Sequence, residues 1–377
     1  MKHHAQIINK TKSVLAVTTL FALVVLAAPS ESTVQAGQPP TKSGYQVLAP
    51  ISHGNLTIFP VVSANLHEGN FLTLDEGLRS GEVVVTEAGG IQPLIRRYHP
   101  VPLPRPGGAQ VNNLMLVNNS DRPLLLLAGE IVTGGKQDRV VGKDRIIPAK
   151  SDPVDLAVFC VEPGRWVEKT SHFNGLATMM AQPSVRRRAM ADKDQSKVWS
   201  EVRGASAGMA TAAPAAGEAL QSTTSYATVM ENRTVQKQVE SVASPIQHSY
   251  ETLIRDLRER NAVGVVVAVN GRIIWADIFA NTRLLEKYWQ KLVRSYATEA
   301  IVTASDGGEV DIKSAAAFLQ QMNGRREVVE TEPGVYRHAE ITGLGYKVFE
   351  LTSLMSKNSF SVHTAKMVDA GPVPRME

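Results

Sequence analysis

Two segments organise this chain: LLLLAGEIVTGGKQDR, residues 124–139, and VDLAVFCVEPGRW, residues 154–166. Each begins as a short apolar run, typical of a buried strand, and ends in a turn rich in glycine and charge. Between Leu124 and Trp166 lie a carboxylate with apolar neighbours, two glycines before a lysine, the only cysteine and an Arg-Trp pair. We therefore expect a functional site in a β-rich region built around this stretch.

Composition narrows the class of protein. The chain has 377 residues, of which 43% are hydrophobic and 20% charged, as in ordinary soluble proteins. Its net charge is +4, and the first 36 residues carry three lysines and Glu31, so about +2 remains on residues 37–377 (4 − 2). This balance gives no support for nucleic-acid binding.

The N-terminus has the pattern of a secretory signal peptide over residues 1–36. Basic residues precede an apolar run from Val14 to Ala28, which is short for a membrane span, and Val34-Gln35-Ala36 fits a cleavage site. We expect cleavage after Ala36 and an exported protein, periplasmic or extracellular, with no membrane attachment afterwards. The alternative is an uncleaved N-terminal anchor. The single Cys160 cannot form an internal disulfide.

The remaining chain predicts one α+β domain with an antiparallel β-rich core. Residues 37–50 form a flexible lead-in, and residues 51–170 form a β-rich segment of short strands and turns. Residues 171–243 are a helical, partly flexible insert. Residues 244–370 complete the core with a hairpin, a helix and strands. The Ala-, Gly-, Ser- and Thr-rich stretch Gly204–Ser222 is the part of the insert expected to be flexible.

Several elements of the first segment follow from local signals. Residues 55–62 predict a strand in which Pro60 marks a sheet edge. Thr73 is an N-cap for a short helix over residues 74–80, which Gly81 ends. Residues 110–117 and 124–128 predict a hairpin around the polar turn between them.

The last segment has the clearest signals. Ser244-Pro245 predicts a new helix start, and Asn270-Gly271 predicts a tight turn in a hairpin over residues 263–279. A helix capped at Asn281 is expected over residues 282–298, with Lys287, Lys291 and Arg294 on one solvated face. The other expected strands are 326–330, 336–341, 345–351 and 359–366.

The turn Gly134-Gly135-Lys136 predicts an anion site. Adjacent glycines let backbone N–H groups approach an anion, and Lys136 and Arg139 could share its charge. A phosphate loop of the Walker type is excluded, because the glycine spacing differs and Gln137 replaces the hydroxyl residue. The alternative is a glycine turn with solvated charges.

Two carboxylates follow apolar strands in this stretch. Glu130 and Glu162 could supply a general acid and base, or hold a divalent metal. They could instead pair with Lys136, Arg139 or Arg165 in a structural ion network.

Arg165-Trp166 could clamp a planar or phosphorylated ligand by stacking and bidentate hydrogen bonds. Alternatively, the indole could simply cover the end of the sheet.

Cys160 alternates with Val154, Leu156 and Val158, so these four share one strand face. A cysteine on an apolar face is usually an inert core residue. The alternative role is a nucleophile, which would need a nearby base and a positive environment.

The stretch is similar to a known family. Five segments carry the resemblance: 127–130 (LAGE), 135–139 (GKQDR), 160–166 (CVEPGRW), the hairpin 264–279 and the helix segment 289–296. They resemble the ARG and Rhodanese-Phosphatase-superfamily-associated protein domain, an uncharacterised bacterial family. The resemblance spans most of residues 53–366. It implies association with ADP-ribosylglycohydrolases and phosphatase-like proteins, and hence a ligand such as ADP-ribose or a related phosphorylated nucleoside.

These observations lead to one functional hypothesis and one alternative. The hypothesis is a binding or hydrolytic site for a phosphorylated or otherwise anionic small molecule. Its expected residues are Glu130, Lys136, Gln137, Arg139, Glu162, Arg165 and Trp166. The alternative is a non-catalytic exported interaction module that docks through the insert or the proline-rich loop at residues 100–108. The sequence does not specify the substrate, the metal or the oligomeric state.

Overall fold

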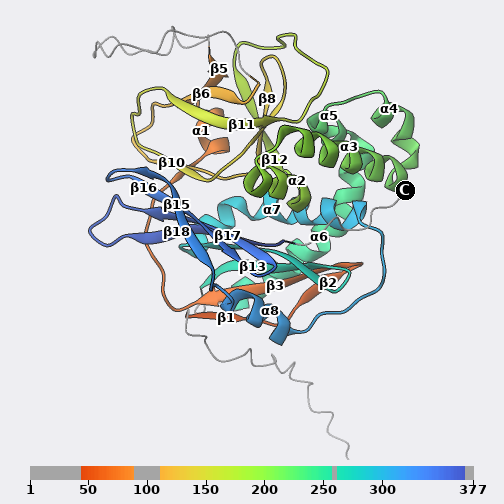
Figure 1. Ribbon diagram of the computed structural model, residues 1–377. Helices are drawn as coiled ribbons and strands as arrows, with labels where there is room; N and C mark the ends of the chain where they lie inside the picture. The colour runs from red at the N-terminus through yellow and green to blue at the C-terminus, as the bar shows by residue number, and fades with distance from the viewer. Residues whose placement is uncertain (1–43, 89–110, 257–260, 370–377) are drawn as a thin grey trace, which may run out of the picture. The chain divides into compact units, whose positions relative to one another are not determined.

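The hairpin around Asn270-Gly271 lies inside the largest sheet of this computed structural model, which describes residues 44–88, 111–256 and 261–369 (Figure 1). Strands β13 (Ala262–Val269) and β14 (Arg272–Phe279) pair antiparallel, as predicted. Asn270 and Gly271 have φ angles of 52° and 68°, the left-handed values that such a two-residue turn requires.

The hairpin belongs to a nine-stranded antiparallel sheet in the order β1-β3-β13-β14-β18-β17-β16-β15, in which β2 also pairs with β3. Strands far apart in the chain meet here, because β3 of the first segment pairs directly with β13 of the last. The other strands are β1 (Tyr45–Val47), β2 (Ile51–His53), β3 (Leu56–Ser63), β15 (Arg325–Glu332), β16 (Tyr336–Gly343), β17 (Tyr346–Ser353) and β18 (Phe360–Val368).

The prediction that Pro60 marks a sheet edge is wrong. Strand β3 has β13 on one side and both β1 and β2 on the other. Pro60 falls between the residues that pair with β1 and those that pair with β2, and its carbonyl accepts a hydrogen bond from the backbone N–H of Leu48. Proline has no backbone N–H to donate, but no neighbouring strand needs a hydrogen bond from this position, so the ladder is intact.

The first segment forms two smaller sheets. The six-stranded sheet has the order β12-β8-β9-β11-β6-β5, and the three-stranded sheet has the order β10-β7-β4. Their strands are β4 (Leu72–Thr73), β5 (Val83–Glu87), β6 (Asn113–Asn118), β7 (Leu124–Leu126), β8 (Glu130–Gly134), β9 (Arg139–Val141), β10 (Arg145–Ile147), β11 (Val154–Cys160) and β12 (Phe173–Met180).

The predicted hairpin of residues 110–117 with 124–128 is wrong. Strand β6 pairs with β5 and β11, whereas β7 pairs with β4 and β10 in the other sheet. Leu116 of β6 and Leu126 of β7 share one apolar cluster, so the two strands pack face to face instead of side by side. The Asn118 amide donates to the carbonyls of Arg122 and Pro148, which holds the crossing turn.

Helix α7 (Thr282–Val302) connects the layers. It begins at the predicted N-cap Asn281 and packs against β13 on one side and β12 on another (Figure 1). Helix α1 (Leu74–Ser80) has the predicted Thr73 cap and ends at Gly81. The remaining α-helices are α2 (Pro183–Arg187), α3 (Gln195–Ala212), α4 (Gly217–Gln221), α5 (Tyr226–Glu231), α6 (Arg233–Asp256) and α8 (Ile312–Gln320). Two short helices of other types are the π-helix η3 (Arg188–Asp192) and the 3₁₀ helix η4 (Pro214–Ala216).

One prediction for the insert and one for the start of the last segment are wrong. Gly204–Ser222 is helical: α3 covers its first half, and Gly208 lies against Val302 of α7. The composition, rich in small residues, was read as typical of a flexible segment. In the structure, small residues here allow α3 and α7 to approach closely. Helix α6 runs through Pro245 without a new start, although proline cannot donate the usual hydrogen bond there.

The α+β class with antiparallel sheets is confirmed. The predicted signal peptide and the proline-rich loop lie outside the described residues. No helix within the described ranges is long and apolar enough to cross a bilayer.

Candidate functional site

The loop that follows β8 and the loop that follows β11 contact each other. The turn of residues 134–138 follows β8, and the loop of residues 162–170 follows β11. Gly134 and Gly135 adopt φ angles of 125° and 48°. A Cβ on Gly135 would lie 2.2 Å from the Phe173 ring, so glycine is required for this close approach.

Arg165 joins the two loops. Its guanidinium donates to the carbonyl of Gly135 at 2.8 Å and to that of Val167 at 2.7 Å. The same group lies 2.5 Å from a carboxylate oxygen of Glu162 and 3.4 Å from one of Asp138. The predicted site residues Glu162 and Arg165 therefore meet, but as an ion pair with each other, which is the arrangement of a structural network.

Asp138 and Glu162 form a pair of neighbouring buried carboxylates. Burial, together with the charge of Glu162, raises the pKa of Asp138. Burial opposes the shift at Glu162, but the hydrogen bond from Arg165 holds the pKa of Glu162 below its ordinary value. Asp138 also accepts from the Gly134 N–H at 3.0 Å and from the Ser225 hydroxyl at 2.8 Å. Both carboxylates are thus fully engaged by the protein.

Trp166 is the exposed part of the site, with 43% of its surface accessible. The Lys136 ammonium lies 5.2 Å from the centre of the indole ring, and the Arg139 guanidinium carbon lies 5.9 Å from it. Both distances are within cation–π range. The structure therefore brings Lys136, Arg139 and Trp166, three of the expected site residues, close together.

Several buried polar atoms around this turn have no hydrogen-bond partner among the described residues. They are Oε1 of Gln137, Nη2 of Arg139, Nε of Arg165 and Oε2 of Glu87. Native proteins leave few buried polar atoms unsatisfied, and a group of them in one place calls for a binding partner or water. The other Glu87 oxygen accepts from the Lys136 N–H at 2.8 Å.

Glu130 does not join this cluster. It begins β8, whereas the 134–138 turn ends the strand, about 13 Å away at strand rise. Its carboxylate is fully buried, accepts from the Leu127 N–H at 2.9 Å and pairs with Lys291 at 3.0 Å. Burial raises the pKa of Glu130. Its position is that of a core residue.

The prediction that Lys287, Lys291 and Arg294 form a solvated face of α7 is therefore wrong. Lys291 is buried and also pairs with Asp75 at 2.5 Å, and Lys287 pairs with Glu76 at 2.9 Å. Through these ion pairs the two lysines connect α7 to α1 and β8. A charge pattern along a helix looks the same in the sequence whether the lysines pair with buried carboxylates or face solvent.

Cys160 is a buried thiol on the predicted strand face. Burial raises the pKa of Cys160, and its sulfur accepts a hydrogen bond from the Glu162 N–H at 3.3 Å. A nucleophilic cysteine requires a lowered pKa and access to solvent, and neither is present. His172, the nearest histidine in sequence, is exposed.

The whole β-rich core with its hairpin and helix matches one protein family. The sequence model of the ARG and Rhodanese-Phosphatase-superfamily-associated Protein domain, ARPP-1, matches residues 44–365. The chain belongs to the ARPP-1 family. Neither the curated proteins nor the solved structures contain a match to it. The resemblance seen in the GKQDR and CVEPGRW segments is thereby confirmed.

The ARPP-1 domain also contains a buried polar network that the sequence did not reveal. His363 lies 2.6 Å from Asp144 and 3.1 Å from Asp277, and Arg186 makes a bidentate pair with Asp277 at 2.9 and 3.0 Å. Tyr296 donates to the same Asp277. These side chains come from β18, β14, α2, α7 and the turn before β10, and all are inaccessible to solvent.

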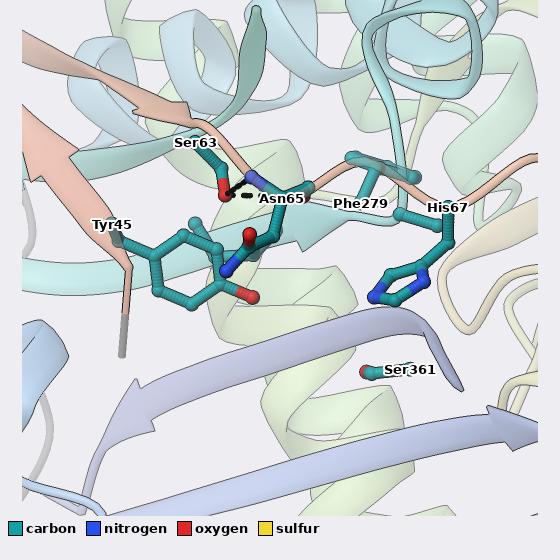
Figure 2. A pocket seen from close by; sticks show the side chains of 8 residues that line it. Tyr45, Ser63, Asn65, His67, Phe279 and Ser361 are labelled. Carbon is teal, nitrogen blue, oxygen red and sulfur yellow. Dashed lines mark hydrogen bonds between the residues drawn. The ribbon is translucent and has the colours of Figure 1, made fainter. Parts of the chain in front are cut away.

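Two further features of the ARPP-1 chain bear on ligands. Within the described ranges, no three His, Cys, Asp or Glu side chains are placed to hold a metal ion, so the divalent-metal hypothesis gains no support. A separate pocket of about 130 Å³ lies between β1, β14 and β18 (Figure 2). Tyr45, Asn65, His67 and Ser361 surround it, and no predicted site residue lines it.

Sequence reasoning missed Asp138, Ser225, Lys169 and Glu87. Asp138 stands inside the GKQDR segment, so its motif was a usable signal. Lys169 pairs with Glu162 at 3.3 Å and its N–H donates to the Gly135 carbonyl at 2.9 Å. Ser225 and Glu87 lie far away in sequence, and nothing in their neighbourhood marks them.

Proposed function

We propose that the loops of residues 134–138 and 162–170 bind an anionic small molecule that carries a flat group. The observation that carries this proposal is the shared environment of Trp166, where Lys136 and Arg139 both approach one accessible indole ring. Lys136 makes no side-chain ion pair within the described part of the chain, and Arg139 keeps a buried nitrogen without a partner there. Arg139 is fully buried and donates to the Val111 carbonyl, so Lys136 is the cation of this pair that a ligand reaches, and Arg139 adds its charge from inside the protein. A reachable cation beside an aromatic wall suits a phosphorylated nucleoside.

The carboxylates favour binding over hydrolysis. A general acid or base must be free to exchange a proton with the ligand. The carboxylate oxygens of Asp138 and Glu162 instead accept hydrogen bonds from Arg165, Ser225 and backbone N–H groups. The family name, with its reference to ARG and phosphatase-associated proteins, favours ADP-ribose or a related nucleoside diphosphate as the ligand.

A thermal-shift screen tests this function. Candidate ligands are ADP-ribose, nucleotide diphosphate sugars and inorganic pyrophosphate, each with and without divalent metal ions. Binding to the native state alone raises the unfolding temperature as ligand concentration rises. We expect a shift with ADP-ribose that is reduced in Trp166→Ala, because the stacking surface is lost. No shift with any of these anions would contradict the proposal.

We also propose that the protein acts outside the cytosol, with a mature N-terminus at Gly37. The basic start and apolar run of residues 1–36 support this location. N-terminal sequencing of the exported protein should begin at Gly37, whereas a soluble protein that retains Met1 would contradict it.

A further inference from the structure

The pocket of about 130 Å³ lies where β1, the loop after β3, the end of β14 and the start of β18 meet (Figure 2). Figure 2 shows Tyr45 and Asn65 on one side of it and His67 and Ser361 on the other. Ser63 and residues 278–280 complete the wall. None of these residues belongs to the loops of residues 134–138 and 162–170, so the pocket is separate from the proposed anion site.

His67 has a fixed position in this pocket. Its backbone N–H donates to the carbonyl of Ala280 at 3.0 Å, and its carbonyl accepts from the Asn281 amide at 2.7 Å. Its ring stacks on that of Phe360, with the ring centres 5.1 Å apart and the planes 14° apart. The ring nitrogens make no hydrogen bond to any residue that the structure describes, so the imidazole edge is available to a ligand.

Asn65 is positioned by a tight turn. The Ser63 hydroxyl accepts from the Asn65 N–H and donates to the Asn65 carbonyl, both at 3.1 Å. The Asn65 side chain lies close to Gly44, where an added Cβ would be 3.0 Å from the amide nitrogen. Within the described ranges this amide has no hydrogen-bond partner. The turn therefore fixes the backbone of Asn65, while the donor and the acceptor of its side chain remain for a ligand.

The polar lining suits an uncharged ligand. None of the described residues that line the pocket is a lysine, an arginine, an aspartate or a glutamate. Amide, hydroxyl and neutral imidazole groups each offer a donor and an acceptor, so they match a molecule whose edge also has both. An asparagine amide forms two such hydrogen bonds at once with the edge of a nucleobase.

The size of the pocket restricts the ligand to a single ring. A cavity of about 150 Å³ accommodates benzene. A pocket of about 130 Å³ therefore has room for one six-membered ring but not for a whole nucleoside. The flat rings of Tyr45 and His67 in the lining suit a flat molecule. We propose that this pocket binds a free pyrimidine base of the uracil and cytosine type.

Calorimetric titration with uracil and with cytosine tests the proposal. Wild type should bind both bases, because an asparagine amide can turn to match either donor–acceptor edge. Asn65→Ala should weaken the binding of both about tenfold, since their hydrogen bonds to the amide are lost. Asn65→Asp should weaken uracil binding more than cytosine binding. A carboxylate only accepts hydrogen bonds, and cytosine still has an amino group that donates to it.

Asn323→Ala provides the matched control. Asn323 is exposed, and its carbonyl accepts from the hydroxyl of Tyr346, which pairs with Val368 at the end of β18 opposite to Ser361. Its replacement should leave uracil binding unchanged. Ribose serves as the probe for the rival class of ligand, a small neutral sugar. Wild type that binds neither base, or that binds ribose instead of the bases, would overturn the proposal. So would an Asn65→Ala protein that binds uracil as tightly as wild type.

Discussion

Arg165 holds the two loops of the candidate site together. Its acceptors include backbone carbonyls of the 134–138 turn and of its own loop, and the carboxylates of Asp138 and Glu162. The carboxylates lose their solvent on burial and depend on this guanidinium for compensation. Lys136, by contrast, lies over the Trp166 ring, and its side chain makes no ion pair with another residue in the described ranges. The two cations therefore have different roles.

Replacement of Arg165 should destabilise the fold. Arg165→Ala strands the buried Glu162 and Asp138, and we expect a loss of about 2–4 kcal/mol in the free energy of unfolding. Arg165→Lys should recover part of it, because a lysine keeps the charge but cannot form the same set of hydrogen bonds. Urea unfolding of both variants measures this. A loss below about 0.5 kcal/mol in Arg165→Ala, the scale of an ordinary surface change, would show that Arg165 does not hold the loops.

At the scale of elements, local signals predicted the hairpin at Asn270-Gly271, the α1 cap at Thr73 and the helix after Asn281, because each depends on neighbouring residues. Predictions failed where tertiary contacts decide. Leu124–Leu126 pairs in a second sheet, and Pro60 lies where two strands leave a gap. In the site, the turn and Trp166 were predictable. The burial of Glu130 against Lys291 was not, because the partner lies 161 residues away.

Helix α3 offers a test of the insert. A Cβ on Gly208 would lie 2.8 Å from the Cβ of Val302 in α7, so a large side chain there must separate the two helices. We expect Gly208→Leu to lower the free energy of unfolding by about 1–3 kcal/mol, the usual cost of overpacking. It should also make residues 204–222 sensitive to limited proteolysis.

Ala207→Leu is the control, because Ala207 is exposed on the same helix. Equal stability of the two leucine variants would show that α3 does not pack against α7 as described.

The whole molecule is joined by the buried network of His363, Asp144, Asp277 and Arg186. Arg186 also donates to the carbonyl of Ala128, in the turn that joins β7 of one small sheet to β8 of the other. Asp277 and His363 belong to the nine-stranded sheet. Burial alone would lower the pKa of His363, but Asp144, and then Asp277, raise it to about 9. The imidazolium is thus a charged link between the sheets, one that requires both aspartates to be ionised.

This link predicts a pH dependence of stability. The pKa of His363 is about 9 in the folded state and near 6.5 in the unfolded chain. Its contribution is therefore complete below pH 6.5 and is lost as pH rises to about 9, on the order of 3 kcal/mol. The difference in unfolding free energy between wild type and His363→Gln should shrink over this window.

Direct NMR titration of the His363 ring in the folded wild type is the companion measurement, and it does not depend on the variant folding. A ring that titrates near pH 6.5 would contradict the charged link.

Calorimetric titration with ADP-ribose and with pyrophosphate measures whether the residues beside Trp166 bind an anion. The proteins compared are wild type, Lys136→Ala and the control Lys313→Ala, whose lysine is exposed on α8. All three should have similar unfolding free energies, because an exposed or partly exposed lysine adds little stability. We expect Lys136→Ala to weaken binding by about 1.5–3 kcal/mol and Lys313→Ala to bind like wild type. Equal affinities for all three proteins, or no binding by wild type, would contradict an anion site beside Trp166.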